Sequence, residues 1–506
     1  MNTSLNQPLN IVILGGGTAG WMAANLMVKR WGSRANIRLV ESPDVGIIGV
    51  GEGSTPSLRR FFQLIDVEEH QWMPRCQATY KLNISFKYWS PVSGIEAYSH
   101  PFPAQVDSFT KRAFMVNTRT RRMGLKTHTL PQDFLLNGLL ANEYCGPKAP
   151  ANFPFKLEYG YHFNSGLLGE FLSELAQQRG VAYQQAHVTS VEQHPNGELA
   201  ALVTDSSEKI AGDLFVDCTG FAALLMQKTL GVQFNSYKEN LFNDSAVVAP
   251  TPMLSAEQGD IPVETTSTAL SNGWCWKIPL TERFGNGYVY ASDFISADQA
   301  ETEFRQHLGL LDSDQAVNHL KMKVGSLSQH WSHNCIALGL SQGFIEPLEA
   351  TALHLVQVSI ELFMQQFEAG GFSAQNRAQF NQQMAERFAG VRDYIVAHYK
   401  LNTRDDSEYW RANRANMALS DSLKQLLHVW YSKEDLSEEI ARQNIYKHFD
   451  DVSWHCLLAG YGAFPDLHPN QPGKGDLYQE QGVQAFLSGC RLNFKSHREN
   501  LEALSL

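Results

Sequence analysis

The chain has 506 residues, which is too long for one small core and suits two or three domains or one large α/β enzyme. Its content of 43% hydrophobic and 18% charged residues is ordinary for a globular protein. A formal net charge of −11 argues against binding to nucleic acid or to an anionic membrane surface. No apolar run approaches the roughly 20 residues that a membrane-spanning helix needs.

The first residues and the cysteines indicate the cellular compartment of the protein. Residues 1–10 have neither the basic nor the apolar region of a secretory signal, so we expect no signal peptide. The seven cysteines are scattered singly, which is typical of reduced thiols in a cytoplasmic protein. Neither they nor the 17 histidines form a cluster with metal-ligand spacing, so we expect no bound metal.

The N-terminal segment has the pattern of a dinucleotide-binding unit. The apolar run at residues 11–14 predicts a buried parallel strand, and residues 21–27 predict a helix. Between them lie Gly15, Gly17 and Gly20 in the spacing G-x-G-x-x-G. That spacing allows a tight turn, a close approach of the backbone to a pyrophosphate, and packing of the helix on the strand.

Two further features support a nucleotide at this turn. Thr18 and Ala19 lie in the turn just before the predicted helix, whose N-terminus offers free amides and a positive dipole to phosphate groups. A second strand, at residues 37–40, ends in Glu41, where a carboxylate can accept a hydrogen bond from a ribose hydroxyl.

A later segment indicates FAD rather than NAD. Residues 213–217 predict a strand that leads into Asp217-Cys-Thr-Gly220, a pattern common in FAD enzymes, where it folds back onto the nucleotide. No second glycine-rich unit is present for NAD(P)H. We therefore predict an α/β chain with an FAD-binding Rossmann-like fold of the GR2, monooxygenase type, with a β-rich cover and a helical C-terminal substrate-binding part.

The remaining segments are expected to form one interdigitated catalytic unit. A discontinuous FAD-binding module should span residues 1–400, and a mainly helical part at 401–506 should close the substrate pocket. Within the module we predict an excursion over the pocket at 56–155, an amphipathic helix at 166–178, a strand at 180–183, a hairpin from 199–204 and 210–216, a β-rich cover at 241–300 and helices from 352 to 400.

Four segments together point to a known family. They are Trp274-Cys-Trp276-Lys-Ile-Pro, Gly51-Glu52-Gly-Ser-Thr-Pro, Lys81 in a K-x-x-x-x-F-x-x-W string, and Glu346-Pro-Leu-Glu349-Ala-Thr351. Alone, the tryptophan pair is equally compatible with a core strand of large side chains. As a set, the segments resemble the flavin-dependent halogenases of the tryptophan halogenase type. The resemblance covers roughly residues 10–410 and fades after that.

The resemblance implies the reacting groups. Lys81 would be the catalytic lysine, and if its segment is one strand, Lys81, Asn83 and Ser85 face the same way. A lysine held among apolar groups has a lowered pKa, and it would either hydrogen-bond hypohalous acid or form a haloamine. Glu349 would face it across the substrate and orient the halogenating species or accept the ring proton, with Glu346 a lesser candidate.

The resemblance also implies the surrounding sites. Gly51, Glu52 and Leu340 would contact the flavin, and the amides at Thr351 and Ala352 would hold a halide. Trp274 and Trp276 would line a tunnel between flavin and substrate. The substrate itself would meet His100 and Phe102, and near the C-terminus the aromatic walls Tyr446, Phe449 and Trp454.

The implied activity is that of a two-component halogenase. FAD, reduced by a separate flavin reductase, would give hypohalous acid with oxygen and chloride or bromide. The acid would pass through the tunnel to Lys81 and halogenate a small electron-rich aromatic, an indole or tryptophan. An aromatic monooxygenase on the same fold and a flavin-storing protein are the alternatives. A homodimer is one option that the sequence leaves open.

Overall fold

A computed structural model describes residues 7–44, 51–253, 260–471 and 480–504. Its centre holds a six-stranded sheet in the order β20-β21-β12-β1-β2-β8, parallel except at β20. The strands are β1 (Leu9–Leu14), β2 (Ala35–Glu41), β8 (Ala182–Gln185), β12 (Leu214–Asp217), β20 (Trp331–Ser332) and β21 (Cys335–Ala337). The predicted Rossmann-like unit is therefore confirmed.

Strand β1 shows why these segments are apolar throughout. Ile11 and Ile13 pack on the side of α1 (Thr18–Trp31), together with Met22. Val12 and Leu14 face the other way and pack against a small sheet of β9 (Val188–Gln193), β10 (Leu199–Thr204) and β11 (Lys209–Ala211). The predicted hairpin at 199–216 is thus split, because β10 and β11 pair with each other while β12 returns to the main sheet.

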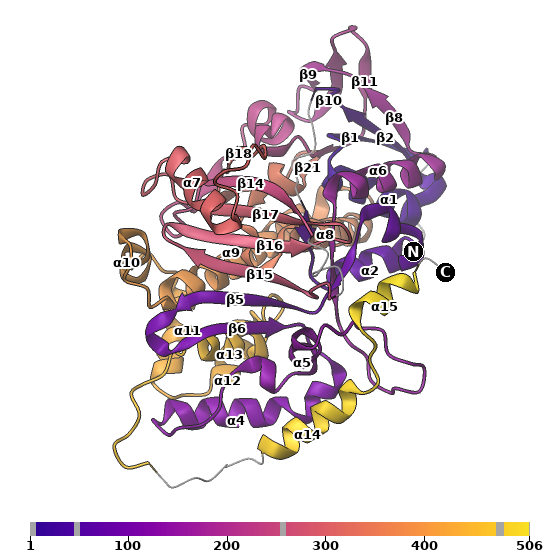
Figure 1. Ribbon diagram of the computed structural model, residues 1–506. Coiled ribbons are helices and arrows are strands. Elements are labelled where there is room, and N and C mark those ends of the chain that lie inside the picture. The colour runs from indigo at the N-terminus through magenta and orange to yellow at the C-terminus, as the bar shows by residue number, and fades with distance from the viewer. Residues whose placement is uncertain (1–6, 45–50, 254–259, 472–479, 505–506) are drawn as a thin grey trace.

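A second, seven-stranded sheet lies beside the first (Figure 1). Its order is β18-β14-β17-β16-β15-β5-β6, from β5 (Asn83–Ser90), β6 (Ile95–Pro101), β14 (Ser245–Pro252), β15 (Glu264–Leu270), β16 (Gly273–Pro279), β17 (Arg283–Tyr290) and β18 (Asn318–Lys321). Residues 241–300 are therefore rich in strands, as predicted. Helix α7 (Ala297–Leu308) packs on one face, against Cys275 and Tyr288. The tryptophan pair points to the other face.

The predicted excursion at 56–155 builds more than a cover, since it supplies β5 and β6 of that sheet. It also contains α2 (Ser57–Leu64), α3 (Glu69–Trp72), α4 (Lys111–Arg122) and α5 (Leu136–Asn142). Two further small sheets are β3-β7-β4, from β3 (Glu52–Gly53), β7 (Gly160–Phe163) and β4 (Thr79–Lys81), and β13-β19-β22, from β13 (Phe234–Ser236), β19 (Gly325–Leu327) and β22 (Gly343–Phe344).

The segment around Lys81 differs from the expected single strand. Lys81 ends β4, whereas Asn83 begins β5 in a different sheet. Asn83 pairs with Glu264, and successive residues of a strand point to opposite faces, so its side chain lies on the face opposite Thr265. The Nζ atom of Lys81 lies on the Thr265 side. The expectation that Lys81 and Asn83 face the same way is wrong, because the chain changes sheets between them.

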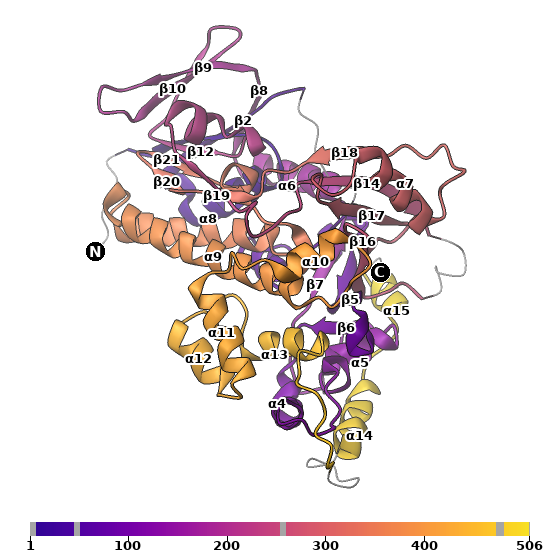
Figure 2. The ribbon, with the colours of Figure 1, turned by 90° about the vertical axis from the view of Figure 1, so that its left-hand side faces the viewer.

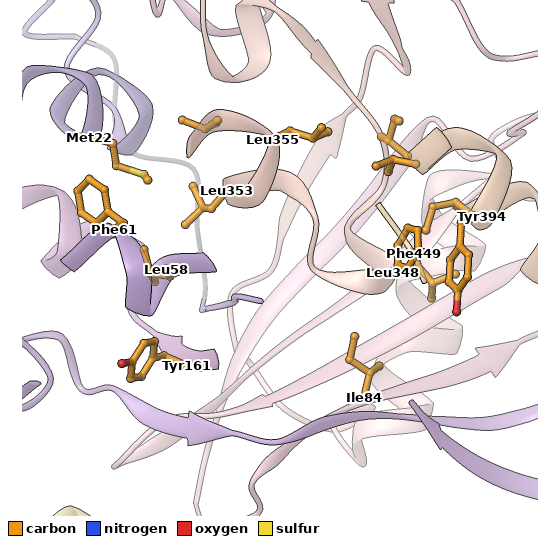
Figure 3. Close-up of a cluster of buried hydrophobic side chains, with 14 of the residues drawn as sticks. Met22, Leu58, Phe61, Ile84, Tyr161, Leu348, Leu353, Leu355, Tyr394 and Phe449 are labelled. Atoms are coloured by element: carbon orange, nitrogen blue, oxygen red, sulfur yellow. The ribbon is translucent and has the colours of Figure 1, made fainter. Parts of the chain in front are cut away.

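Helices complete the molecule (Figure 2). The long α8 (Ala352–Ala369) and α9 (Arg377–Leu401) pack together, with α6 (Ser165–Gln178) against α1. Figure 3 shows Leu353 of α8 lying toward Met22 and Phe61, which joins the C-terminal half to the nucleotide unit. The end of the chain is helical: α10 (Glu408–Ala415), α11 (Asp421–Tyr431), α12 (Leu436–Gln443), α13 (Asp451–Gly460), α14 (Glu480–Arg491) and α15 (His497–Glu502). Within the described ranges, no helix is long and apolar enough to span a bilayer.

Candidate active site

The glycine turn lies at the carboxyl edge of the parallel sheet, directly after β1. Gly15 has φ +113°, and a Cβ there would lie 2.2 Å from the carbonyl oxygen of Cys218. A Cβ on Gly20 would lie 2.1 Å from the carbonyl oxygen of Gly15. A Cβ on Gly17, by contrast, would meet nothing within 4 Å. The first and third glycines are therefore required by packing, and the second leaves space beside the N-terminus of α1.

Glu41 lies against the same turn, at the end of β2. A Cβ on Gly16 would meet its carboxylate at 2.3 Å, and the Tyr183 hydroxyl donates to its Oε2 at 2.8 Å. A cavity of about 360 Å³ opens here, lined by Gly16, Trp21, Glu41, Gly169, Glu170, Ser173, Glu174 and Tyr183. The cavity joins the glycine turn to the carboxylate, as binding of the adenosine half of a dinucleotide requires.

The other predicted nucleotide residues converge on this edge. The carbonyl oxygen of Gly220 accepts from the Ser341 hydroxyl at 3.1 Å, and Ser341 is in the turn that holds Leu340. The neighbouring Gly339 lies so close to Ala19 that a Cβ there would come within 2.9 Å of the Ala19 methyl. The ends of β1, β12 and β21 thus build one surface, on which Thr18 and Ala19 form the first turn of α1.

Asp217 supports this surface from the protein interior. Its side chain is fully buried and accepts from the backbone amides of Thr219, Leu225 and Met226, and from the Thr219 hydroxyl. Because both carboxylate oxygens are engaged, Asp217 shapes the turn that carries Gly220 and leaves no oxygen free for a ligand.

Gly51 and Glu52 directly precede Gly53, which lies against Nζ of Lys81. The residues just before them, 45–50, lie outside the described part of the chain. Gly51 packs on Gly285 and Ile278 of the seven-stranded sheet. Glu52 pairs with Phe163 in β3, and burial raises the pKa of its carboxyl to about 7.

Lys81 is completely buried, and its Nζ has no hydrogen-bond partner among the described residues. The atom lies 5.5 Å from the centre of the Phe102 ring, and a Cβ on Gly53 would come within 3.2 Å of it. Burial lowers the pKa of Lys81 to about 7, although the Glu349 carboxylate acts in the opposite direction. A fully buried ammonium with no hydrogen-bond partner is costly, which makes this lysine a candidate functional residue.

Glu349 lies between two imidazoles. Its Oε2 is 3.0 Å from Nδ1 of His100, and its Oε1 is 3.0 Å from Nε2 of His398. Burial alone would raise the pKa of this carboxyl, but the two histidines lower it to about 2. Electrostatic coupling links Lys81 to both Glu349 and His100, so the predicted reacting groups share one site.

The tryptophan pair stands on β16 with the ring centres 6.0 Å apart. Nε1 of Trp274 donates to Glu346, whose Oε2 also accepts from Asn243 and Tyr399. Trp276 is only partly buried and lies over Gly287, where a Cβ would come within 2.1 Å of its ring. Glu346, the lesser candidate, thus anchors Trp274, and burial raises its pKa.

Thr351 and Ala352 begin α8 immediately after Glu349. The Thr351 hydroxyl is buried without a hydrogen-bond partner among the described residues, and no side chain caps the helix. Ala350 has φ +55°, in the left-handed region that costs a residue with a Cβ roughly 1–2 kcal/mol. This strained turn presents the first amides of α8 beside the carboxylate, an arrangement that suits an anion.

The expected aromatic walls are only partly assembled. Trp454 is buried edge-on against Tyr394, with 4.9 Å between the ring centres, and Phe449 stacks on the same tyrosine at 3.6 Å. Figure 3 shows Phe449 and Tyr394 lying together beside Leu348. Tyr446 is 53% exposed and lines no wall, because it lies in the turn before α13 and points to solvent.

Sequence reasoning missed His398, Tyr461 and Ser453. The hydroxyl of Tyr461 lies 3.1 Å from Nδ1 of His398, and that of Ser453 lies 3.1 Å from Nε2 of His100. Only His398 left a signal, as a lone histidine in the otherwise apolar and aromatic stretch 394–399. Ser453 reaches the site from a distant turn, and nothing in its local sequence marks it.

A glycine turn at the carboxyl edge of a parallel sheet, with a carboxylate at the end of the next strand, defines a dinucleotide-binding protein. The family model described as tryptophan halogenase matches residues 10–473. Tryptophan 6-halogenase SttH of Streptomyces toxytricini is 37% identical over 92% of this chain and 91% of its own length. The chain belongs to the tryptophan halogenase family and is a flavin-dependent halogenase. The match continues past residue 410, where we expected it to fade.

Solved structures agree. The crystal structure of SttH superposes with a TM-score of 0.85 at 34% identity, covering 98% of this chain and 100% of that one. BrvH, a flavin-dependent halogenase from Brevundimonas sp. BAL3, gives a TM-score of 0.82 at 30% identity, covering 99% of this chain and 100% of its own.

Proposed function

We propose that the protein is a two-component halogenase that acts on an indole ring, free or as tryptophan. A separate flavin reductase supplies reduced FAD, and the halogen comes from chloride or bromide. The observation that carries the proposal is the buried Lys81, whose Nζ has no hydrogen-bond partner among the described residues and is coupled electrostatically to Glu349. Two relatives, tryptophan 6-halogenase SttH and 7-chloro-L-tryptophan 6-halogenase KtzR, are named for tryptophan substrates, which supports an indole ring as the substrate.

The glycine turn fits FAD on two observations. The space next to Gly17 leaves room for a pyrophosphate at the N-terminus of α1, and Oε1 of Glu41 has no partner among the described residues, which leaves it for a ribose hydroxyl. Bound FAD would supply oxidising power from oxygen, which turns halide into hypohalous acid. The amides at Thr351 and Ala352 would hold the halide.

Lys81 then directs the halogen. With a pKa of about 7, its amine exists in both charged and neutral forms near neutral pH. The charged form donates a hydrogen bond to hypohalous acid, which makes the halogen more electrophilic, and the neutral form can carry the halogen as a haloamine. Either way, complete burial keeps bulk water from competing for the Nζ atom.

Trp274 and Trp276 separate the formation of hypohalous acid at the flavin from the halogenation of the aromatic substrate. Trp274 is held by its hydrogen bond to Glu346. The ring of Trp276 lies against Gly287, where a side chain would occupy its place. Two indole rings held in this way keep an aromatic substrate away from the flavin, which opposes ordinary hydroxylation. Small hypohalous acid can still travel past them to Lys81.

The test is a reaction with a flavin reductase, NADH, bromide and indole, analysed by mass spectrometry for the bromine isotope pair. Brominated indole supports the proposal. A hydroxylated product would indicate the monooxygenase instead, and FAD binding without any turnover would indicate flavin storage.

A further inference from the structure

Strand β4, which carries Lys81, is only three residues long and lies at the edge of its small sheet, where it pairs with β7. Lys81 itself stands opposite Gly160 of β7. Because Nζ of Lys81 has no hydrogen-bond partner among the described residues, no hydrogen bond at the end of the side chain fixes the amine. Its position therefore depends on packing and on the backbone of β4, including whatever holds the second edge of this strand.

The second edge of β4 faces the segment that leads into β15. The amide of Leu82 donates to the carbonyl oxygen of Val263 at 2.7 Å, and from there on β5 and β15 run parallel. In a parallel ladder, the preceding bond on this edge would run from the amide of Tyr80 to the carbonyl oxygen of Ile261. Instead, the Tyr80 amide donates to Nε2 of His497 at 3.0 Å, and Nδ1 of the same ring lies 2.9 Å from the Ile261 oxygen.

These two contacts fix the tautomer of His497. A backbone amide can only donate and a carbonyl oxygen can only accept, so Nε2 is unprotonated and Nδ1 carries the proton. The ring is therefore neutral, which agrees with its burial, since burial lowers the pKa of His497 to about 4. A neutral imidazole offers one acceptor and one donor, as a peptide group does, so it bridges the two backbone groups where a direct bond would otherwise form.

Helix α15 brings this imidazole from the far end of the chain, 417 residues after Tyr80. The amide of His497 donates to the carbonyl oxygen of Tyr144 at 2.7 Å. One turn later, Oδ1 of Asn500 accepts from the amide of Lys148 at 2.9 Å. The helix is thus held on the segment that follows α5 by contacts that do not involve β4, while the His497 ring reaches across to β4.

We propose that His497 is a positioning residue for Lys81, whose imidazole holds β4 where Nζ can meet hypohalous acid. The inference rests on the proposed function. Because Tyr80 directly precedes Lys81, loss of the imidazole releases the backbone one peptide bond away from the reacting residue. Both nitrogens of His497 are occupied by backbone groups, so the ring acts through β4 and takes no part in the reaction itself.

The first measurement compares the bromination of indole by the unsubstituted enzyme and by His497→Ala. A misplaced Nζ should lower kcat by roughly 10–10²-fold, while FAD binding and the reoxidation of reduced flavin persist. Unused hypobromous acid should then escape, and an amine trap in solution measures it. Added imidazole should fill the vacated space and restore part of the rate. If imidazole again protects the Tyr80 amide from hydrogen exchange but restores no rate, the inference is wrong.

Asn500→Ala is the matched control, because it loosens the same helix without touching β4. We expect it to lower the temperature of thermal unfolding and to leave the bromination rate nearly unchanged, with no response to imidazole. An equal loss of rate in Asn500→Ala and His497→Ala would show that His497 only anchors α15, which contradicts the inference.

A second pair of variants serves if His497→Ala does not fold. His497→Gln and His497→Leu both keep a large side chain, but only glutamine offers a donor and an acceptor. The glutamine variant should therefore keep more of the rate, and equal rates would contradict the inference. Hydrogen exchange at Tyr80 needs no turnover. Rapid exchange of this amide in the unsubstituted protein would contradict the inference, whereas absence of brominated product from that protein would contradict the proposed function.

Discussion

Trp274 is tied to Glu346 by a hydrogen bond of 3.0 Å between Nε1 and Oε2. Glu346 is buried three residues before Glu349, at the start of the same turn. The bond therefore connects the tryptophan pair on β16 with the turn that carries the carboxylate and opens α8. Asn243 and Tyr399 donate to the same oxygen, so the tryptophan pair and the turn of Glu349 belong to one hydrogen-bonded unit.

Trp274→Phe should loosen this unit. The ring is kept, but Glu346 loses one donor while still buried, so we expect a loss of roughly 1–3 kcal/mol in the free energy of unfolding. Halogenation should fall with it. The matched control is Trp276→Phe, because Nε1 of Trp276 has no partner among the described residues. Denaturant unfolding of both variants checks the prediction, and equal losses would contradict it.

Lys81→Met should remove activity and raise stability. The lowered pKa of Lys81 means that protonation opposes folding, so an uncharged side chain should stabilise the fold by on the order of 1–5 kcal/mol near pH 7. The direction in which stability changes with pH follows from the number of protons that the native and unfolded states bind. Between about pH 7 and the ordinary lysine value, the unfolded chain holds a proton that the native site has lost, so the unsubstituted protein gains stability as pH rises.

The advantage of Lys81→Met should therefore be largest at and below pH 7 and shrink toward pH 10. Thermal unfolding across this range measures it. FAD binding and the reoxidation of reduced flavin should persist, because in the proposed mechanism Lys81 acts only after hypohalous acid has formed. Near-normal halogenation by this variant would remove Lys81 from the mechanism.

Two substitutions in the glycine turn should affect folding and cofactor binding separately. Gly20→Ala would place a Cβ 2.1 Å from the carbonyl oxygen of Gly15, so it should destabilise the fold. Gly17→Ala meets no protein atom and has φ −70°, so it should fold normally yet bind FAD weakly, because the methyl group occupies the phosphate space. Thermal unfolding and FAD titration measure the two effects.

NADPH should not bind tightly to the unsubstituted protein, and saturable tight binding would contradict the FAD assignment.

Local pattern was enough to predict the nucleotide unit. The strand at 11–14, the glycine spacing and Glu41 depend on contacts between residues that are close in the sequence. The sequence pattern alone therefore predicts them. The network around Glu349 could not be predicted in this way. His100, His398 and Ser453 come from three distant elements, and only packing brings them to one carboxylate. Likewise, the change of sheet between Lys81 and Asn83 depends on which strands they pair with, not on their own sequence.

Free indole should compete well with tryptophan as the substrate, and bromide should be preferred to chloride. The C-terminal segment 440–456 supplies aromatic rings in Phe449 and Trp454, but we recognise no set of groups there for an amino-acid head. A site built to hydrogen-bond that head would discriminate strongly against a substrate without it, since its own polar groups would be left unpaired. At the proposed halide turn, Ala350 and Ala352 carry only methyl side chains, so the turn should admit the larger, more easily oxidised bromide. Parallel assays of indole and tryptophan, each with chloride and with bromide, compare kcat/KM. A strong preference for tryptophan with chloride would show that the C-terminal part contains a head-group site formed, like the Glu349 network, by residues distant in sequence.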